Sequence, residues 1–299
     1  MFEAVPNVSE GRDQATIEEM SSAIRRTDGV RLLNVSSDED HNRTVFTYVS
    51  DDASGIEEAS VALFNIAVRR IDLRTHRGAH PRTGAVDVLP FVPLDDTTMD
   101  ECVGLAVKVG RRVADRFGIP VYLYEYAARA ETRRDLPAIR SGQFEKFAEK
   151  IADPAWAPDF GPSEIHTTSG IAIIGARDPL IAFNVQLATN RLEVAATIAR
   201  AVRESSGGLR YVRALPIFLE HRGVVQVSMN LLDYRRTPIH RAFELVKQEA
   251  ARYGVQVLSS EIVGLVPMDA LLATAEWNLQ LENFSNKLVL EERIREESN

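Results

Sequence analysis

Hydrophobic positions along the first third of the chain follow two periods, and the alternation between them outlines a fold. Runs in which every second residue is apolar predict strands, and apolar residues three or four positions apart predict helices. Up to residue 93 these runs predict a strand, a helix, two strands, a helix and a strand, at 2–10, 13–26, 30–37, 42–50, 55–71 and 85–93. This order is that of a split β-α-β unit of the ferredoxin-like type.

Beyond this unit the pattern predicts further elements. A helix is expected to open at Thr98, because Thr98 and Glu101 have the spacing of a capping box. A strand at 120–127 follows, and 136–152 contains another helix. The stretch 153–170 combines prolines with glycines, which predicts a linker or a binding loop.

The same order of elements returns in the second half of the chain. Strands are expected at 180–188, 209–220, 223–234 and 255–265. The intervening helices start at Asn190, whose spacing to Glu193 suits a cap, and at Thr237-Pro238, with the proline in the first helical turn. Pro267 opens a last helix.

The chain therefore predicts an α/β (α+β) protein of two ferredoxin-like β-α-β-β-α-β subdomains. We place the first at 1–178, the second at 179–282 and a charged, helical tail at 283–299. Sheets of this type bury one face on helices and leave the other in need of cover. We expect the two open faces to cover each other, with a crevice for a ligand between them.

Charge and composition exclude several classes of partner. The formal net charge of −8 argues against nucleic acid, since a phosphate backbone is usually met by a basic surface. No apolar run approaches the roughly 20 residues that span a bilayer, and the N-terminus lacks the pattern of a secretion signal. The single cysteine, Cys102, cannot form an internal disulfide. These features lead us to expect a cytoplasmic protein.

The densest chemistry lies in the stretch "THRGAHPRTGAVDVLPF" at 75–91. His80 titrates in a range that allows it to take and return a proton near neutral pH. Arg77 and Arg82 suit carboxylates and would hold down the imidazole pKa, leaving the ring free to act as a base. The loop thus predicts acid–base chemistry on an anionic substrate. For His76, capping of the preceding helix is an equally good interpretation.

A metal site is the alternative interpretation of the two histidines. His76 and His80 are four residues apart, a spacing that places two ligands on one face of a helix. Gly78 and Pro81 oppose a helix there, and no cysteine or glutamate completes a zinc-type ligand set. We therefore expect no metal.

Three other stretches have both a structural and a functional interpretation. Residues 40–44, which include Arg43, have the composition of a tight turn but could also present a cation. Residues 5–12, with Asn7, end a strand before a helix, where backbone amides could bind a carboxylate. The glycines of 161–177 would let a flat ligand approach the backbone, or form a hinge.

Taken together, the motifs resemble the formiminotransferase family, the folate-dependent glutamate formimidoyltransferases. The resemblance runs in family order from about residue 3 to 282. The matching pieces are "VPNVSEGR", "NRTVFT", "HRGAHPRTGAVDVLPFVP", "PVYLY", "LPAIRSGQFE", "DFGPS", "GAR" with "LIAFNV", "VSMNLLDY" and "IVGLVP". The H-x-G-x-H-P-R block is the most specific of them.

The resemblance implies two subdomains whose sheets face each other across a folate tunnel, in a homodimer. It implies transfer of a formimino group from N-formimino-L-glutamate to N5 of tetrahydrofolate, a step of histidine degradation that needs no metal. By the motif match the catalytic histidine is His80. The folate-binding segment falls on Gly161, Pro162, Ser163, Ser169 and Gly170. Between them this chain departs from its relatives, with "EIHTT" where an aromatic residue and a tryptophan often stand.

The hypothesis from the sequence is thus a glutamate formimidoyltransferase with His80 as the acid–base catalyst. Arg43, Arg77 and Arg82 would bind anionic groups, with Asn7 and His76 as supporting groups. Three alternatives remain open: a paralogue that acts on 5-formyltetrahydrofolate, a hydrolase that acts on formiminoglutamate without folate, and a folate-binding protein without turnover.

Overall fold

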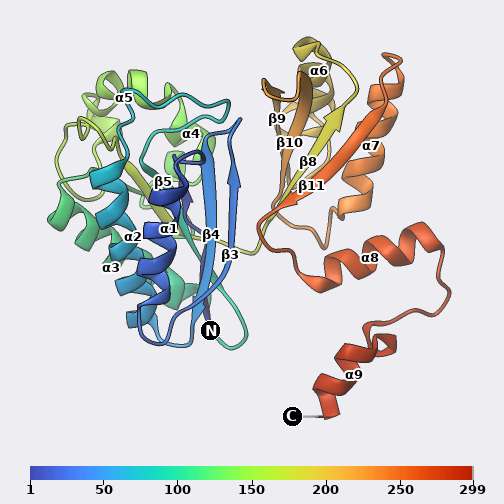
Figure 1. The fold of residues 1–299 in the computed structure, drawn as a ribbon, viewed down its shortest axis with the longest axis horizontal. Helices are drawn as coiled ribbons and strands as arrows, with labels where there is room; N and C mark the ends of the chain where they lie inside the picture. Colours follow the sequence, from blue (N-terminus) through green and yellow to red (C-terminus); the bar gives the residue numbers. More distant parts are fainter. Residues whose placement is uncertain (298–299) are drawn as a thin grey trace. The chain divides into compact units, whose positions relative to one another are not determined.

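The computed structural model describes residues 1–297 and divides into two compact units, Met1–Pro179 and a second that begins at Leu180 (Figure 1). Each unit has its own sheet and its own hydrophobic core. The prediction of an α+β protein with two such subdomains is confirmed. Within the described residues, no helix is long and apolar enough to cross a membrane.

The first unit contains a seven-stranded mixed sheet. Its strands are β1 Phe2–Ala4, β2 Asn7–Val8, β3 Arg31–Asp38, β4 Arg43–Ser50, β5 Val86–Pro93, β6 Val121–Glu125 and β7 Ala172–Ala176. β1 and β2 are two pieces of one central strand, because both pair antiparallel with β4 on one side and β5 on the other. β3 pairs with the far side of β4. This part has the predicted ferredoxin-like order.

Two further strands extend that order. β7 pairs parallel with β5, and β6 pairs parallel with β7, so the last strand in sequence lies between two earlier ones. The sequence predicted a strand at β6 but not the position of β6 or β7 in the sheet. The insertion of β7 brings the segment just before it alongside the loop that leads into β5.

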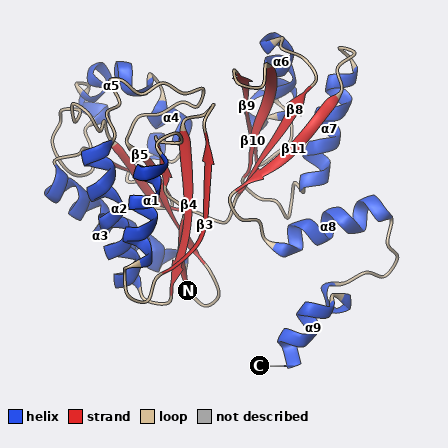
Figure 2. Ribbon diagram, in the orientation of Figure 1, coloured by secondary structure: helices blue, strands red, loops and turns tan. Residues whose placement is uncertain are grey.

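Helices lie on both faces of the first sheet, and on one of them they pack only against the part formed by β5, β6 and β7; Figure 2 shows the helices and strands of this unit. On one face lie α1 Gln14–Arg25, α2 Ala53–Arg70 and α3 Met99–Phe117, whose apolar residues form one core with the sheet. α3 begins with the capping box predicted from Thr98 and Glu101. On the other face α4 Leu136–Arg140 and α5 Gln143–Ile151 enclose a smaller cluster that includes Tyr122 and Ile173.

The helix predicted within 136–152 is present as α5, but the stretch also holds the short helix α4, which was not predicted. The chain forms α4 and α5 with a break at Ser141 and Gly142, and Gly142 has a φ of 89°. A left-handed backbone cannot continue an α-helix, and glycine adopts it without a steric penalty. The break matters for the site described below, because it redirects the chain between Arg140 and Glu145.

The second unit is a four-stranded antiparallel sheet in the order β11-β8-β10-β9, as the ferredoxin-like prediction requires. Its elements are β8 Ile181–Leu187, α6 Leu192–Val202, β9 Val212–Leu219, β10 Val224–Leu231, α7 Ile239–Ala251 and β11 Val257–Val263. α8 Met268–Leu279 and α9 Leu290–Glu297 follow. Two expected details are wrong. The residue that caps α6 is Arg191, not Asn190, and Pro238 occupies the cap of α7 itself, not its first turn.

Candidate functional site

The histidine loop, residues 71–85, joins α2 to β5 and packs against the turn before β4. Asn42 donates from Nδ2 to the carbonyl of Arg77 at 3.0 Å, and Ala79 donates its N–H to the carbonyl of Asp40 at 2.9 Å. Gly78 lies so close to this turn that a Cβ there would be 2.3 Å from the carbonyl oxygen of His41. The structure thus brings together residues 40–44 and the histidine loop, two stretches that are far apart in the sequence.

Both ring nitrogens of His76 are bonded within the protein. Nε2 lies 2.9 Å from the carbonyl oxygen of Asn42, which can only accept, so Nε2 carries the proton. Nδ1 accepts a hydrogen bond of 3.3 Å from Nε of Arg82. Burial, with a further contribution from Arg82, lowers the pKa of His76. A neutral His76 therefore connects the start of β4 with Arg82.

His80 holds its ring differently. Nδ1 lies 2.7 Å from the carbonyl oxygen of Pro81, so Nδ1 carries the proton and the lone pair is on Nε2. The side chain is partly buried, and its ring centroid is 6.1 Å from that of His41. Burial first, then repulsion from Arg43 and Arg140, lowers the pKa of His80 well below 6.5. At neutral pH the ring is therefore uncharged and can accept a proton at Nε2.

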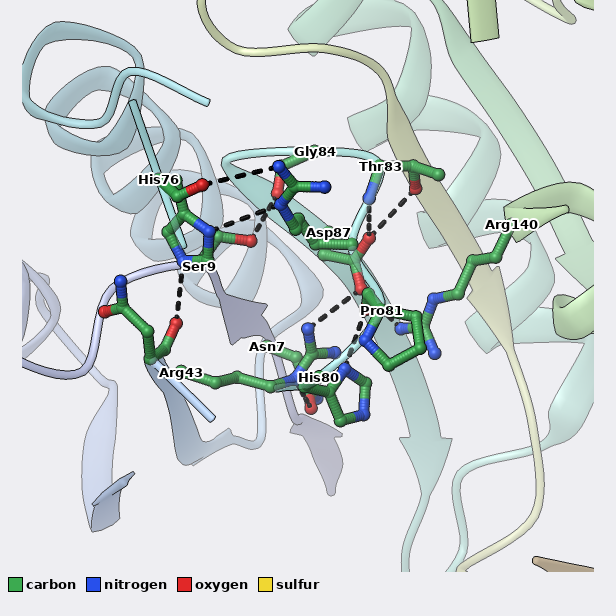
Figure 3. A network of polar contacts seen from close by, with 12 residues as sticks. Asn7, Ser9, Arg43, His76, His80, Pro81, Thr83, Gly84, Asp87 and Arg140 are labelled. Carbon is green, nitrogen blue, oxygen red and sulfur yellow. Dashed lines mark hydrogen bonds and ion pairs between the residues drawn. The ribbon is translucent and has the colours of Figure 1, made fainter. Parts of the chain in front are cut away.

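Beside His80, a fully buried carboxylate organises two arginines (Figure 3). Oδ2 of Asp87 accepts hydrogen bonds from Arg43 at 2.9 Å and from Arg140 at 2.5 Å. Oδ1 accepts from the backbone N–H and the hydroxyl of Thr83, at 2.8 and 2.9 Å. Burial alone would raise the pKa of Asp87, but Arg140 and Arg43 outweigh it and hold that pKa well below its usual range. Asp87 is thus ionised, and the cluster keeps one excess positive charge.

The predicted substrate-binding residues differ in how the structure uses them. Arg43 lies in the Asp87 cluster, and its Nε donates to Oδ1 of Asn7 at 3.1 Å. Arg82 is buried and makes two hydrogen bonds to Glu145 on α5, at 2.9 and 2.6 Å. Arg77 is exposed, and its guanidinium donates to the carbonyl oxygens of Arg74 and His76. The structure thus brings Arg43 next to His80, pairs Arg82 with a carboxylate, and leaves Arg77 at the surface.

The five residues expected to bind folate fall in two places. Ser169 and Gly170 are buried against the histidine loop, where the N–H of Ala85 donates to the carbonyl of Ser169 at 2.9 Å. The hydroxyl of Ser169 is buried and has no hydrogen-bond partner among the described residues. Gly161, Pro162 and Ser163 are exposed.

Asp87 and Arg140 belong to the site but were not predicted from the sequence. Asp87 carried a usable signal, because a carboxylate within the apolar run "AVDVLPFVP" needs a charged or hydrogen-bonding partner when buried. Arg140 carried none, since it is 53 residues from Asp87 and only the fold unites them. Among the described residues, no group of three or more histidine, cysteine, aspartate or glutamate side chains could hold a metal ion.

Matches to known protein families and relatives extend over nearly the entire chain. Residues 1–177 match the model of the formiminotransferase domain, N-terminal subdomain, and residues 182–297 match that of the formiminotransferase domain. The chain is 48% identical to a glutamate formimidoyltransferase of Thermoplasma acidophilum over 100% of its own length and 99% of the relative's. It is 45% identical to one of Streptococcus pyogenes, with 98% of each chain covered.

A longer relative matches over part of its length. The chain is 43% identical to a formimidoyltransferase-cyclodeaminase of Sus scrofa, where the match covers 95% of this chain and 53% of the relative. The family models and the full-length relatives agree with the family that the sequence motifs resemble. The chain therefore belongs to the formiminotransferase family.

Proposed function

We propose that this protein is a glutamate formimidoyltransferase, which transfers the formimino group of N-formimino-L-glutamate to N5 of tetrahydrofolate. Two relatives at 45–48% identity that align over nearly their full lengths carry that name, and both subdomain models of the family match. The observation that carries the chemistry is the His80 ring, with its Nδ1 proton held by Pro81 and its Nε2 lone pair available. No metal takes part in the proposed reaction.

The reaction needs one group that first accepts and then donates a proton. N5 of tetrahydrofolate attacks the amidine carbon, a tetrahedral intermediate forms, and Nε2 of His80 takes the N5 proton. The bond between that carbon and the nitrogen of glutamate then breaks, and His80 delivers the proton to the departing amine. The products are 5-formiminotetrahydrofolate and glutamate. General acid–base catalysis of this kind contributes a factor of about 10²–10⁴ in rate.

The electrostatics around His80 suit the first of these steps. The ring is neutral at pH 7 because burial and the two arginines lower its pKa. A bound carboxylate would offset part of that positive charge and make Nε2 more basic once substrate is present. The base thus gains strength when the substrate to be deprotonated is in place.

The other predicted residues receive roles consistent with their contacts. Arg43 would attract the anionic substrate, and Asn7 would orient its guanidinium through the 3.1 Å hydrogen bond. His76 and Arg82 would support the loop from within, and Arg77 would meet substrate from the surface. Gly161, Pro162, Ser163, Ser169 and Gly170 remain our proposal for the folate-binding segment, and the homodimer and the cytoplasmic location remain predictions.

Product analysis tests the function directly. Purified protein with N-formimino-L-glutamate and tetrahydrofolate should give 5-formiminotetrahydrofolate and glutamate in equal amounts, and omission of tetrahydrofolate should stop the release of glutamate. Ammonia or formamide released without tetrahydrofolate would instead identify a hydrolase. Turnover of 5-formyltetrahydrofolate, without turnover of formiminoglutamate, would identify the paralogous activity. Tight folate binding with no product in any of these mixtures would identify a folate-binding protein without turnover.

A further inference from the structure

Arg140 and Arg43 share a single carboxylate oxygen. Both donate to Oδ2 of Asp87, while Oδ1 is occupied by the two hydrogen bonds from Thr83. The Asp87 side chain is fully buried, and those of Arg43 and Arg140 are only 8% and 15% exposed. One negative charge therefore faces two positive charges in a place poorly reached by water. Such an excess is costly unless a second anion compensates it.

The two guanidinium groups differ in how completely they are bonded. Arg43 donates from Nε to Asn7 and from a terminal nitrogen to Asp87. Arg140 makes one hydrogen bond, to Asp87, and its Nε is buried without a partner among the described residues. A buried N–H without an acceptor costs free energy and is rare in folded proteins, so the Arg140 guanidinium has hydrogen-bonding capacity that the described residues do not use.

The backbone holds Arg140 firmly in this position. It is the last residue of α4, and the turn at Ser141 and Gly142 then leads directly to α5. Ile139, its neighbour, is buried in the cluster on that face of the sheet, and the ammonium group of Lys150 donates to the carbonyl of Ile139 at 2.9 Å. Arg140 is therefore placed before substrate binds, as an anion site should be.

We propose that Arg140 binds a carboxylate of the formimino donor beside His80. This inference rests on the proposed function and names a substrate-binding residue for it. The guanidinium would use donors not bonded to Asp87, and the donor's carboxylate would supply the missing negative charge. Asp87 then has a second role, since it fixes the orientation of Arg140 and leaves part of its fork of N–H groups for the ligand.

The glutamate of folate is the other possible source of a carboxylate, and the position of His80 argues against it. In the donor, the carboxylates are only a few bonds from the amidine carbon. In tetrahydrofolate, the whole p-aminobenzoyl group separates the glutamate from N5. Arg140 and Arg43 donate to the same oxygen of Asp87 beside the His80 ring (Figure 3), so a carboxylate bound by Arg140 lies near an amidine held at His80, which suits the donor better than the folate glutamate.

Matched variants and donor analogues test this inference. Arg140→Gln removes the charge, Arg140→Lys keeps it, and Arg134→Gln is the control, because Arg134 is exposed and pairs with Glu131 at 3.7 Å. Each variant is assayed with N-formimino-L-glutamate and with its two monoamides, at the α- and the γ-carboxyl group. Far-UV circular dichroism and the melting temperature check that each variant is folded.

We expect Arg140→Gln to raise the KM for formiminoglutamate about 10- to 100-fold, the range for a charge-assisted hydrogen bond. The KM for tetrahydrofolate should change by less than about threefold, which is small compared with the change for formiminoglutamate. Arg140→Lys should recover part of the loss, and Arg134→Gln should behave like the wild type. With the monoamide that lacks the bound carboxylate, wild type and Arg140→Gln should differ little. The monoamide with which the two proteins agree therefore identifies the carboxylate that Arg140 contacts.

Other outcomes would overturn the assignment. An equal loss with formiminoglutamate and both monoamides would make Arg140 only a structural partner of Asp87. A rise in the KM for tetrahydrofolate alone would assign it to the folate glutamate. If the wild type shows no turnover, the proposed function fails. Calorimetry with L-glutamate then tests the carboxylate site at Arg140 separately. Weaker binding to Arg140→Gln than to the wild type would support the carboxylate site, and equal binding or none would reject it.

Discussion

Arg82 in the histidine loop and Glu145 on α5 form a two-pronged ion pair, with hydrogen bonds of 2.9 and 2.6 Å between residues 63 positions apart. Arg82 is buried and also donates to His76, whereas the Glu145 carboxylate is more than half exposed. The pair connects the loop that carries His80 with the segment that carries Arg140. This contact therefore holds the two segments of the candidate site together.

The two partners should contribute unequally to stability. Arg82→Gln should lower the free energy of unfolding by about 2–3 kcal/mol, since it leaves the buried side of the pair and His76 without their partner. Glu145→Gln should cost less than about 1 kcal/mol, because its carboxylate is largely in water. Urea denaturation of the two single variants and the double variant measures the coupling. A coupling energy near zero would show that the pair does not hold the loop.

Replacement of His80 tests the catalytic assignment. His80→Ala should reduce kcat by about 10²–10⁴, the contribution of general acid–base catalysis. Tetrahydrofolate affinity should be nearly kept, because the reaction takes the proton from N5 without needing the imidazole to hold the ring. His221→Ala, in the exposed turn between β9 and β10, is the matched control for loss of a histidine. A folded His80→Ala protein with the turnover of the wild type would remove His80 from the mechanism.

The pH dependence follows from the direction of the His80 pKa shift. The pKa is lowered from 6.5, so the free enzyme should keep its base active below pH 6.5 and lose kcat/KM only at still lower pH. Arg140→Gln removes one of the two repelling charges and should move this acid limb upward. An NMR titration of the His80 ring, assigned with the His80→Ala variant, measures the same quantity directly. A midpoint at or above 6.5 would contradict the electrostatics described here.

The same shift has a consequence for stability. The unfolded chain binds a proton at His80 near the ordinary value of 6.5, while the folded chain resists protonation. The stabilising contribution of neutral His80 is therefore present above pH 6.5 and is lost as the pH falls toward its lowered pKa. The His80→Ala variant should show a weaker loss of stability than the wild type between pH 6.5 and 5. An identical pH dependence in both proteins would show that His80 does not titrate in this way.

Elements defined by local sequence could be predicted, and long-range relationships could not. The capping box of Thr98 and Glu101 lies within four residues and formed as expected. The break at Gly142 was missed because helix-forming residues stand on both sides of it, and only the left-handed backbone shows where the helix ends. The insertion of β7 between β5 and β6 depends on pairing between strands about 80 and 50 residues apart, which periodicity does not encode.

The candidate site also combines residues that local sequence could predict with contacts that only the fold creates. The motif that contains His80 is contiguous, so its residue types alone indicated proton transfer. The partner of each nearby arginine depends on the fold: Arg43 on β4 contacts Asp87 on β5, with β2 between these strands, and Arg82 contacts Glu145 on α5. Arg43, Arg82 and Arg77 therefore looked equivalent in the sequence but differ in the structure. Arg43 belongs to the buried Asp87 cluster, Arg82 forms an ion pair with Glu145, and Arg77 lies at the surface. Asp87 was the one residue whose own sequence context could have identified the cluster.

Asp87 itself can be tested by removing its charge while keeping its shape. Asp87→Asn should destabilise the protein by about 3–5 kcal/mol, because two buried guanidinium groups then lose their shared anion. Added phosphate or L-glutamate should restore part of the lost melting temperature by supplying an anion to Arg43 and Arg140. Differential scanning fluorimetry with and without the anion measures both effects. A variant as stable as the wild type would show that the cluster's charges are not held as described.

Gly170 offers a test of the contact between the predicted folate segment and the histidine loop. Gly170 has a φ of 70°, and a Cβ there would lie 2.0 Å from the carbonyl oxygen of Thr83. Gly223, in the β9–β10 turn, has a φ of 63° but no atom near its missing Cβ, so it isolates the cost of the backbone conformation. Gly223→Ala should cost about 1–2 kcal/mol. Gly170→Ala should cost about 1–3 kcal/mol more, because the clash with Thr83 is added.

The same pair of variants should differ in activity. Thr83 donates both of its hydrogen bonds to Asp87, so a shift of Thr83 disturbs the carboxylate that orients Arg43 and Arg140. Gly170→Ala should therefore lower kcat/KM at a temperature where it is still folded, and Gly223→Ala should leave it unchanged. Steady-state kinetics well below both melting temperatures checks this. Equal activity in the two variants would mean that the segment around residue 170 packs against the histidine loop without influencing the geometry at His80.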